Sequence, residues 1–118
     1  MNNFLNTLEF AIFQEVLKTT DSKNRSYLVE HLPYLKIVER KFTGVGLLIF
    51  LDYDINHTLT LLNDYNLNLG SRKSIKFNDF NEYFSFEVSV KMGKITIIEI
   101  VTYASGWSGQ ITSFDFIE

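Results

Sequence analysis

Residues 84–93 read FSFEVSVKMG, in which apolar and polar side chains alternate without a break. This period of two is typical of a half-buried β-strand, because successive side chains of a strand point to opposite faces of the sheet. Residues 95–103, ITIIEIVTY, follow as a second run rich in β-branched side chains. A break at 105–109, SGWSG, precedes a third run at 110–117. We therefore expect three strands joined by tight connections into an antiparallel meander.

The length and composition indicate one folded domain that spans residues 1–118. Apolar residues make up 46% of the chain, and 11 Phe and 6 Tyr supply large side chains for a core. The chain contains no Cys, which excludes disulfides and thiolate sites. Its net charge of −3 argues against a dedicated nucleic-acid-binding protein and permits a basic protein as partner.

The first residues, MNNFLNTLE, carry no positive charge ahead of an apolar stretch and no small-residue cleavage site. They therefore do not resemble a signal peptide. The longest apolar run, residues 45–51, is far shorter than the roughly 18–20 residues that cross a bilayer. From these features we expect a soluble, cytoplasmic protein.

The N-terminal part of the chain predicts helices. Residues 3–18 place apolar side chains at helical spacing. Asn6 with Glu9 has the spacing of a capping box, and Asn2 or Asn3 is an alternative, earlier cap. A polar loop follows at 19–24, and residues 26–32 predict a second, short helix that ends before Pro33.

The middle of the chain predicts strands. Residues 34–42 read as a strand, 43–46 as a bend or bulge in it, and 47–53 as an apolar continuation that is buried on both faces or central in the sheet. For residues 59–69 we expect an irregular or short helical segment, and the sequence does not define the structure of residues 56–74.

A short strand at Ile75 and Phe77 and a loop at 78–82 lead into the alternating strand at 84–93. Together these elements predict an α+β fold. We expect N-terminal helices packed on a predominantly antiparallel, twisted sheet of about five or six strands.

Acidic residues concentrate in the predicted loops of the second half of the chain. They could simply be solvated, or they could form a docking patch that attracts a basic partner and speeds its encounter. The candidate partner-binding residues are Asp52, Asp54, Asp64, Asp79 and Glu82.

Glu99 is the carboxylate of most chemical interest, because simple alternation places it on the same face as Ile95 and Val101. A buried carboxylate needs a partner, and we expect Arg40 to supply a bidentate ion pair. The functional alternative is a catalytic acid with a raised pKa. Trp107 is interpreted either as a lid over the sheet edge, which we favour, or as an exposed binding anchor.

The two histidines, His31 and His57, lie on separate segments without further ligands at matched spacing. Residues 52–56, DYDIN, resemble half of a calcium loop but lack the required Gly and Glu. The sequence therefore predicts no metal site and no cofactor.

Two motifs resemble a family of small bacterial proteins. The first is RKFTGVG at residues 40–46, and the second matches G-x-I-x-x-x-E-x-x-T-Y-x-x-x-W across residues 93–107. The chain departs from the family at Ile100, where a Gly is usual, and at Leu47-Leu48, where aromatic residues are common. The matched residues expected to hold the fold are Arg40, Thr43, Gly44, Gly46, Glu99, Tyr103 and Trp107.

Several members of this family look like immunity proteins, including those of contact-dependent growth inhibition systems. The resemblance implies a protein without enzymatic activity that binds a cognate toxin domain, which could be a basic nuclease, and blocks it by stoichiometric occlusion. Two alternatives stay open. One is a small ligand-binding protein, hydrolase or isomerase that uses Glu99 with Arg40 in a cavity between helix and sheet. The other is a homo-oligomeric module that pairs sheet edges.

Overall fold

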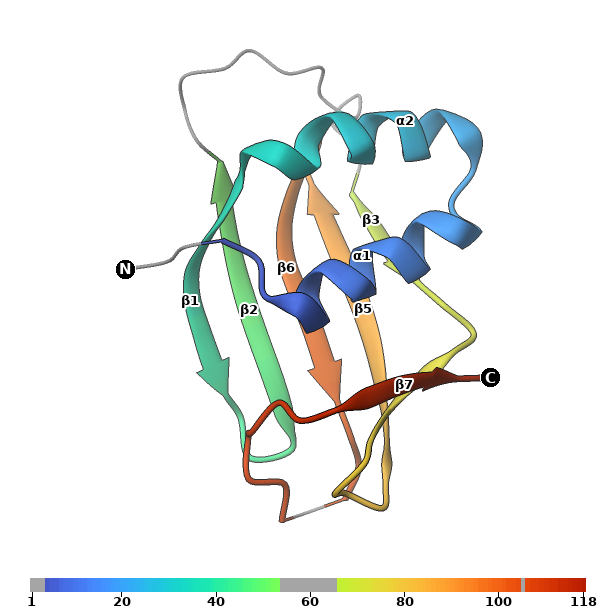
Figure 1. Cartoon of the computed structure of the whole chain (residues 1–118). Coiled ribbons are helices and arrows are strands. Elements are labelled where there is room, and N and C mark those ends of the chain that lie inside the picture. The colour runs from blue at the N-terminus through green and yellow to red at the C-terminus, as the bar shows by residue number, and fades with distance from the viewer. Residues whose placement is uncertain (1–3, 54–65, 105) are drawn as a thin grey trace.

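A computed structural model describes residues 4–53, 66–104 and 106–118, and it confirms the predicted α+β class. Two N-terminal helices lie across one face of an antiparallel sheet (Figure 1). The elements are, in chain order, α1 Thr7–Thr19, α2 Ser22–His31, the short 3-10 helix η1 Leu32–Tyr34, β1 Leu35–Phe42, β2 Gly46–Tyr53, β3 Leu67–Gly70, β4 Ser74–Phe77, β5 Tyr83–Lys91, β6 Lys94–Val101 and β7 Phe114–Ile117. No helix in these ranges is long and apolar enough to cross a membrane.

Helix α1 begins at Thr7, later than the predicted start at residue 3, because Asn6 caps it through a capping box with Glu9. The Glu9 amide donates to Asn6 Oδ1 at 2.8 Å, and the Asn6 amide donates back to Glu9 Oε1 at 2.9 Å. Two amides that would otherwise lack a partner at the helix N-terminus are thereby satisfied. The apolar side of the helix, with Leu8, Ile12 and Val16 buried, packs into the core.

Helix α2 begins earlier than the sequence predicts, so residues 22–24 are helical although we expected a loop there. The reason is the cap: Asp21 Oδ1 accepts the Asn24 amide at 2.9 Å, and the helix starts directly after it. The α-helix ends at His31, and Pro33 lies in η1.

The expectation of a bend at residues 43–46 is wrong in one respect, because the chain reverses there instead of continuing. The Thr43 amide donates to the Gly46 carbonyl at 3.0 Å, and β1 and β2 pair as an antiparallel hairpin from Phe42 opposite Leu47. Gly44 permits the reversal with a φ of 90°, a conformation that costs an L-residue free energy.

The sheet has more strands than expected and a different topology. Its order is β1-β2-β6-β5-β4-β7, and β3 pairs with β5 alongside β4. All these pairings are antiparallel. Residues 67–70 form β3, a strand where an irregular or helical segment was expected, because Leu67 and Leu69 alternate with polar Asn68 along the edge of β5. Residues 56–65 of the undefined middle segment lie outside the described residues.

The meander is confirmed only for β5 and β6. The third strand, β7, starts at Phe114 and pairs with β4, not with β6. It cannot lie beside β6, because β6 already pairs with β5 along one edge and with β2 along the other. Residues 106–113 instead carry the chain across the end of the sheet (Figure 1).

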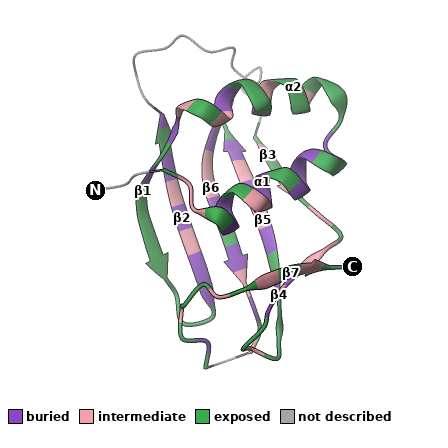
Figure 2. Ribbon diagram, viewed as in Figure 1, coloured by how far each residue is buried: buried purple, intermediate pink, exposed green. Residues whose placement is uncertain are grey.

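The core lies on one face of the sheet, beneath α1, α2 and β7 (Figure 1). Along β2, Leu47, Ile49 and Leu51 are buried against these elements, whereas Leu48 and Phe50 on the opposite face are only half-buried (Figure 2). Of the two expectations for this strand, the central position is confirmed, because β2 lies between β1 and β6, whereas burial on both faces is not. No described element covers that second face, which we call the uncovered face.

Candidate binding surface

The two sequence motifs meet at one end of the sheet. The Thr102 amide donates to the Val45 carbonyl at 2.8 Å, and Gly46 lies opposite Val101. A Cβ atom on Gly46 would come within 2.0 Å of the Ile100 carbonyl oxygen, so only glycine allows β2 and β6 to approach at this point. Residues 40–46 and 93–107 therefore form one structural unit.

Trp107 packs over this unit as the favoured lid interpretation predicts. Its side chain is 5% exposed and its ring stacks on Phe77, with the ring centroids 5.8 Å apart. The edges of Phe84 and Phe42 complete the cluster at 4.8 and 5.7 Å. Tyr103, by contrast, is 98% exposed, which corrects the expectation that it helps to hold the fold.

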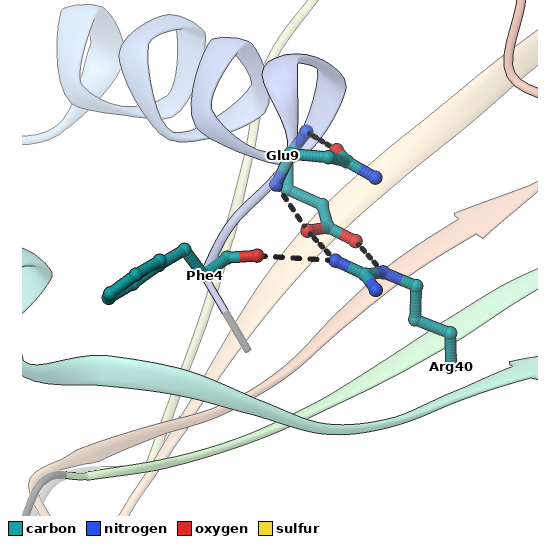
Figure 3. A network of polar contacts seen from close by, with 4 residues as sticks. Phe4, Glu9 and Arg40 are labelled. Carbon is teal, nitrogen blue, oxygen red and sulfur yellow. Dashed lines mark hydrogen bonds and ion pairs between the residues drawn. The ribbon is translucent and has the colours of Figure 1, made fainter. Parts of the chain in front are cut away.

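Arg40 pairs with Glu9 of α1 and not with Glu99. Arg40 Nε lies 2.6 Å from Glu9 Oε2 and Nη2 lies 2.8 Å from Oε1, and Nη2 also donates to the Phe4 carbonyl at 3.4 Å (Figure 3). The hydrogen bonds to Glu9 raise the pKa of Arg40 above its ordinary value. The bidentate pair was therefore predicted with the right cation and the wrong carboxylate.

The error has a geometric cause. Arg40 lies opposite Ile49, whose side chain faces the helices, whereas Glu99 lies opposite Leu48 on the uncovered face. Glu9 was interpreted only as a capping residue. Its place beside Leu8 on the buried side of α1 is the signal that could have identified it as the partner of Arg40.

Glu99 is exposed because a bulge interrupts the alternation of β6. Val90 pairs with Ile95 and the adjacent Ser89 pairs with Ile97, so Thr96 is an extra residue. The extra residue places Ile97 and Glu99 on the uncovered face, away from Ile95. Glu99 and Arg40 lie on opposite faces of the sheet and therefore do not share a cavity between helix and sheet. The hydrolase or isomerase alternative required these two residues to act together.

The acidic residues predicted to bind a partner do not form one surface as far as the structure describes them. Asp52 lies on β2 and not in a loop, opposite Lys36 near the end of the strand. Asp79 and Glu82 lie at the other end of the sheet, before β5, and Asp79 Oδ1 accepts a hydrogen bond from Thr112 at 2.8 Å. Asp54 and Asp64 lie outside the described residues.

The structure instead brings two other carboxylates together on the uncovered face. Glu87 of β5 lies directly opposite Glu99 of β6, and Leu48 of β2 flanks Glu99 on its other side. Within the described ranges neither carboxylate forms an ion pair or a hydrogen bond. Like charges directly opposite each other destabilise a sheet, so this arrangement costs free energy in the isolated protein.

An apolar row adjoins the acidic pair. Phe50 of β2 lies opposite Ile97 of β6, and both side chains are half-buried. On β5 the apolar row ends at Ser89, a polar residue opposite Ile97 whose hydroxyl donates to Asn68 Oδ1 at 3.2 Å. The uncovered face thus combines an apolar centre, formed by Leu48, Phe50 and Ile97, with unpaired negative charge.

A groove of about 530 Å³ lies between α1 and β7, with Phe10 and Phe116 among its lining residues. Its carboxylate, Glu15, already has partners: Lys18 Nζ lies 3.0 Å and Lys73 Nζ 3.4 Å from its oxygens. Burial raises the pKa of Glu15, but the two lysines lower it by more, so the pKa lies below its usual value of 4.5. This groove offers no unpaired charged group to a ligand.

His31 is buried in a structural network. Its Nδ1 lies 2.8 Å from the Tyr53 hydroxyl, which accepts the Ile95 amide at 2.8 Å. Burial raises the pKa of Tyr53 to about 12, so the phenol is neutral at physiological pH. The network links α2 to β2 and β6. The described residues contain no group of three potential metal ligands, and His57 lies outside them.

A scan against protein-family models, a search of curated proteins and a search of solved structures each find no match for this chain.

Proposed function

We propose that this protein is an immunity protein that binds a cognate bacterial toxin domain and neutralises it by stoichiometric occlusion. The observation that carries the proposal is the uncovered face of the sheet. Protein-binding surfaces combine an apolar centre with a polar rim, and exposed apolar patches mark such surfaces. A protein that acts by occlusion needs a rigid surface of this kind and no catalytic residues.

The resemblance in the two motifs supports the same function. Two of the residues that carry it, Gly46 and Trp107, pack the strands together at one end of the sheet. These two are framework residues, whereas Glu99 and Tyr103 of the second motif are exposed, and Glu99 lies on the uncovered face.

The charge of the chain indicates the chemistry of the partner. The net charge of −3 and the unpaired carboxylates favour a basic protein, such as a nuclease domain, and repel nucleic acid. Asp52, Asp79 and Glu82 extend the negative charge to both ends of the sheet and could steer the partner during encounter. A toxin that acts inside the cell would place this protein in the cytoplasm.

The test is co-expression with the product of the adjacent upstream reading frame, followed by purification through a tag on that product. The proposal predicts a complex of one copy of each chain and growth of cells that the upstream product alone would kill. Persistent toxicity with the protein present in excess, and no complex, would contradict the proposal for this neighbour.

A further inference from the structure

We propose that the Glu87–Glu99 pair, which lies beside the apolar row of the uncovered face, takes an arginine or lysine side chain of a basic protein partner. This inference rests on the proposed function for the identity of the partner. The surface itself can be tested without that partner, as described below.

The register of the strands brings the two carboxylates within reach of one cation. Glu87 and Glu99 are directly opposed on β5 and β6, and Cβ atoms of such residues lie about 4.5–5.5 Å apart. A planar guanidinium presents five donors and can hydrogen-bond to both carboxylates at once. Such a cation would replace the repulsion within the pair by two ion pairs.

The neighbours of the pair leave room for this cation. On the far side of Glu87 lies Gly70 of β3, which has no side chain to cover the carboxylate. On the far side of Glu99 lies Leu48, and Phe50 and Ile97 form the adjoining row. This apolar surface can pack against the aliphatic stem of an arginine or lysine.

The same neighbours favour a protein over the other macromolecules that the face might contact. Phosphate groups of nucleic acid or of anionic lipid would be repelled by the two carboxylates. A protein segment with a basic side chain and apolar neighbours matches both the charge and the apolar row. A second copy of this chain is a further possible occupant, and the test below includes it.

The test compares two variants with the same change in charge. Glu87→Gln/Glu99→Gln removes the pair, and Asp79→Asn/Glu82→Gln removes two acids at the end of the sheet. If the upstream product binds, the first variant should weaken its affinity by about 30-fold or more, as expected when a buried charge pair loses one partner. The second should change the affinity by less than about 3-fold, as expected of charges at the rim.

If the upstream product does not bind, the surface is tested by NMR titration of the intact protein with a hexa-arginine peptide. The proposal predicts amide shift changes concentrated on residues 85–89 and 97–101, and their loss in Glu87→Gln/Glu99→Gln. That outcome would support the surface while the proposed function fails for this neighbour.

Three outcomes would overturn the proposal. The first is a complex whose affinity is unchanged in Glu87→Gln/Glu99→Gln. The second is a set of peptide-induced amide shift changes that is lost to the same extent in Asp79→Asn/Glu82→Gln. The third is a concentration-dependent dimer that buries the uncovered face. Thermal unfolding of both variants provides the folding control, because neither substitution removes a packed apolar group.

Discussion

The substitution Arg40→Met leaves the buried Glu9 carboxylate without its ion-pair partner. The Glu9 side chain is 1% exposed, whereas that of Arg40 is 34% exposed. Loss of one partner from a buried pair costs about 3–5 kcal/mol, because the remaining charge is uncompensated. We expect the lower end, about 3 kcal/mol, since water reaches the Arg40 side of the pair and the Asn6 amide still donates to Glu9.

The assay is urea unfolding followed by the fluorescence of Trp107, the single tryptophan, which is buried in the folded state. A double-mutant cycle with Glu9→Gln isolates the pair, because glutamine keeps an oxygen that can accept the Asn6 amide. We expect a coupling free energy of about 2 kcal/mol between the two sites. A loss of stability below about 0.5 kcal/mol in Arg40→Met, or additive effects in the cycle, would show that the ion pair does not stabilise the fold.

Three further predictions concern the framework. Gly46→Ala should lower the free energy of unfolding by about 3 kcal/mol, because the new methyl group meets a backbone oxygen. Gly44→Ala should lower it by about 1–2 kcal/mol, from its positive φ alone. Urea unfolding measures both losses. Trp107→Ala should cost about 3–5 kcal/mol in thermal unfolding, against less than about 0.5 kcal/mol for the exposed Tyr103→Ala. Because its lysine partners lower the pKa of Glu15 in the folded state, this residue stabilises the protein above pH 4.5 and loses that contribution as the pH falls through the folded pKa; Glu15→Gln should flatten the decline in stability measured below pH 4.5.

The parts of the fold that depend on local chemistry could be predicted from the sequence. The spacing of Asn6 and Glu9 indicated the capping box of α1, although the predicted helix began at residue 3 and not at Thr7, and the alternation of residues 84–93 placed β5. Each of these features is set by side chains within a few residues of one another. The α+β class followed from such local patterns.

The parts that failed depend on contacts between distant segments. The bulge at Thr96 moved Glu99 to the opposite face, and nothing in residues 95–103 alone reveals an extra residue relative to β5. The pairing of β7 with β4 depends on β2 having taken the edge of β6. Likewise, Glu87 and Glu99 lie opposite each other because of the register between β5 and β6, and that register cannot be read from the sequence.

The proposed one-to-one neutralisation of a toxin is tested by titrating the activity of the purified upstream product against increasing amounts of this protein. Stoichiometric occlusion predicts that activity falls linearly and reaches zero at an equimolar ratio. Complete loss of activity at a small fraction of that ratio would indicate catalysis, and full activity in excess would indicate no inhibition; either result would contradict stoichiometric occlusion.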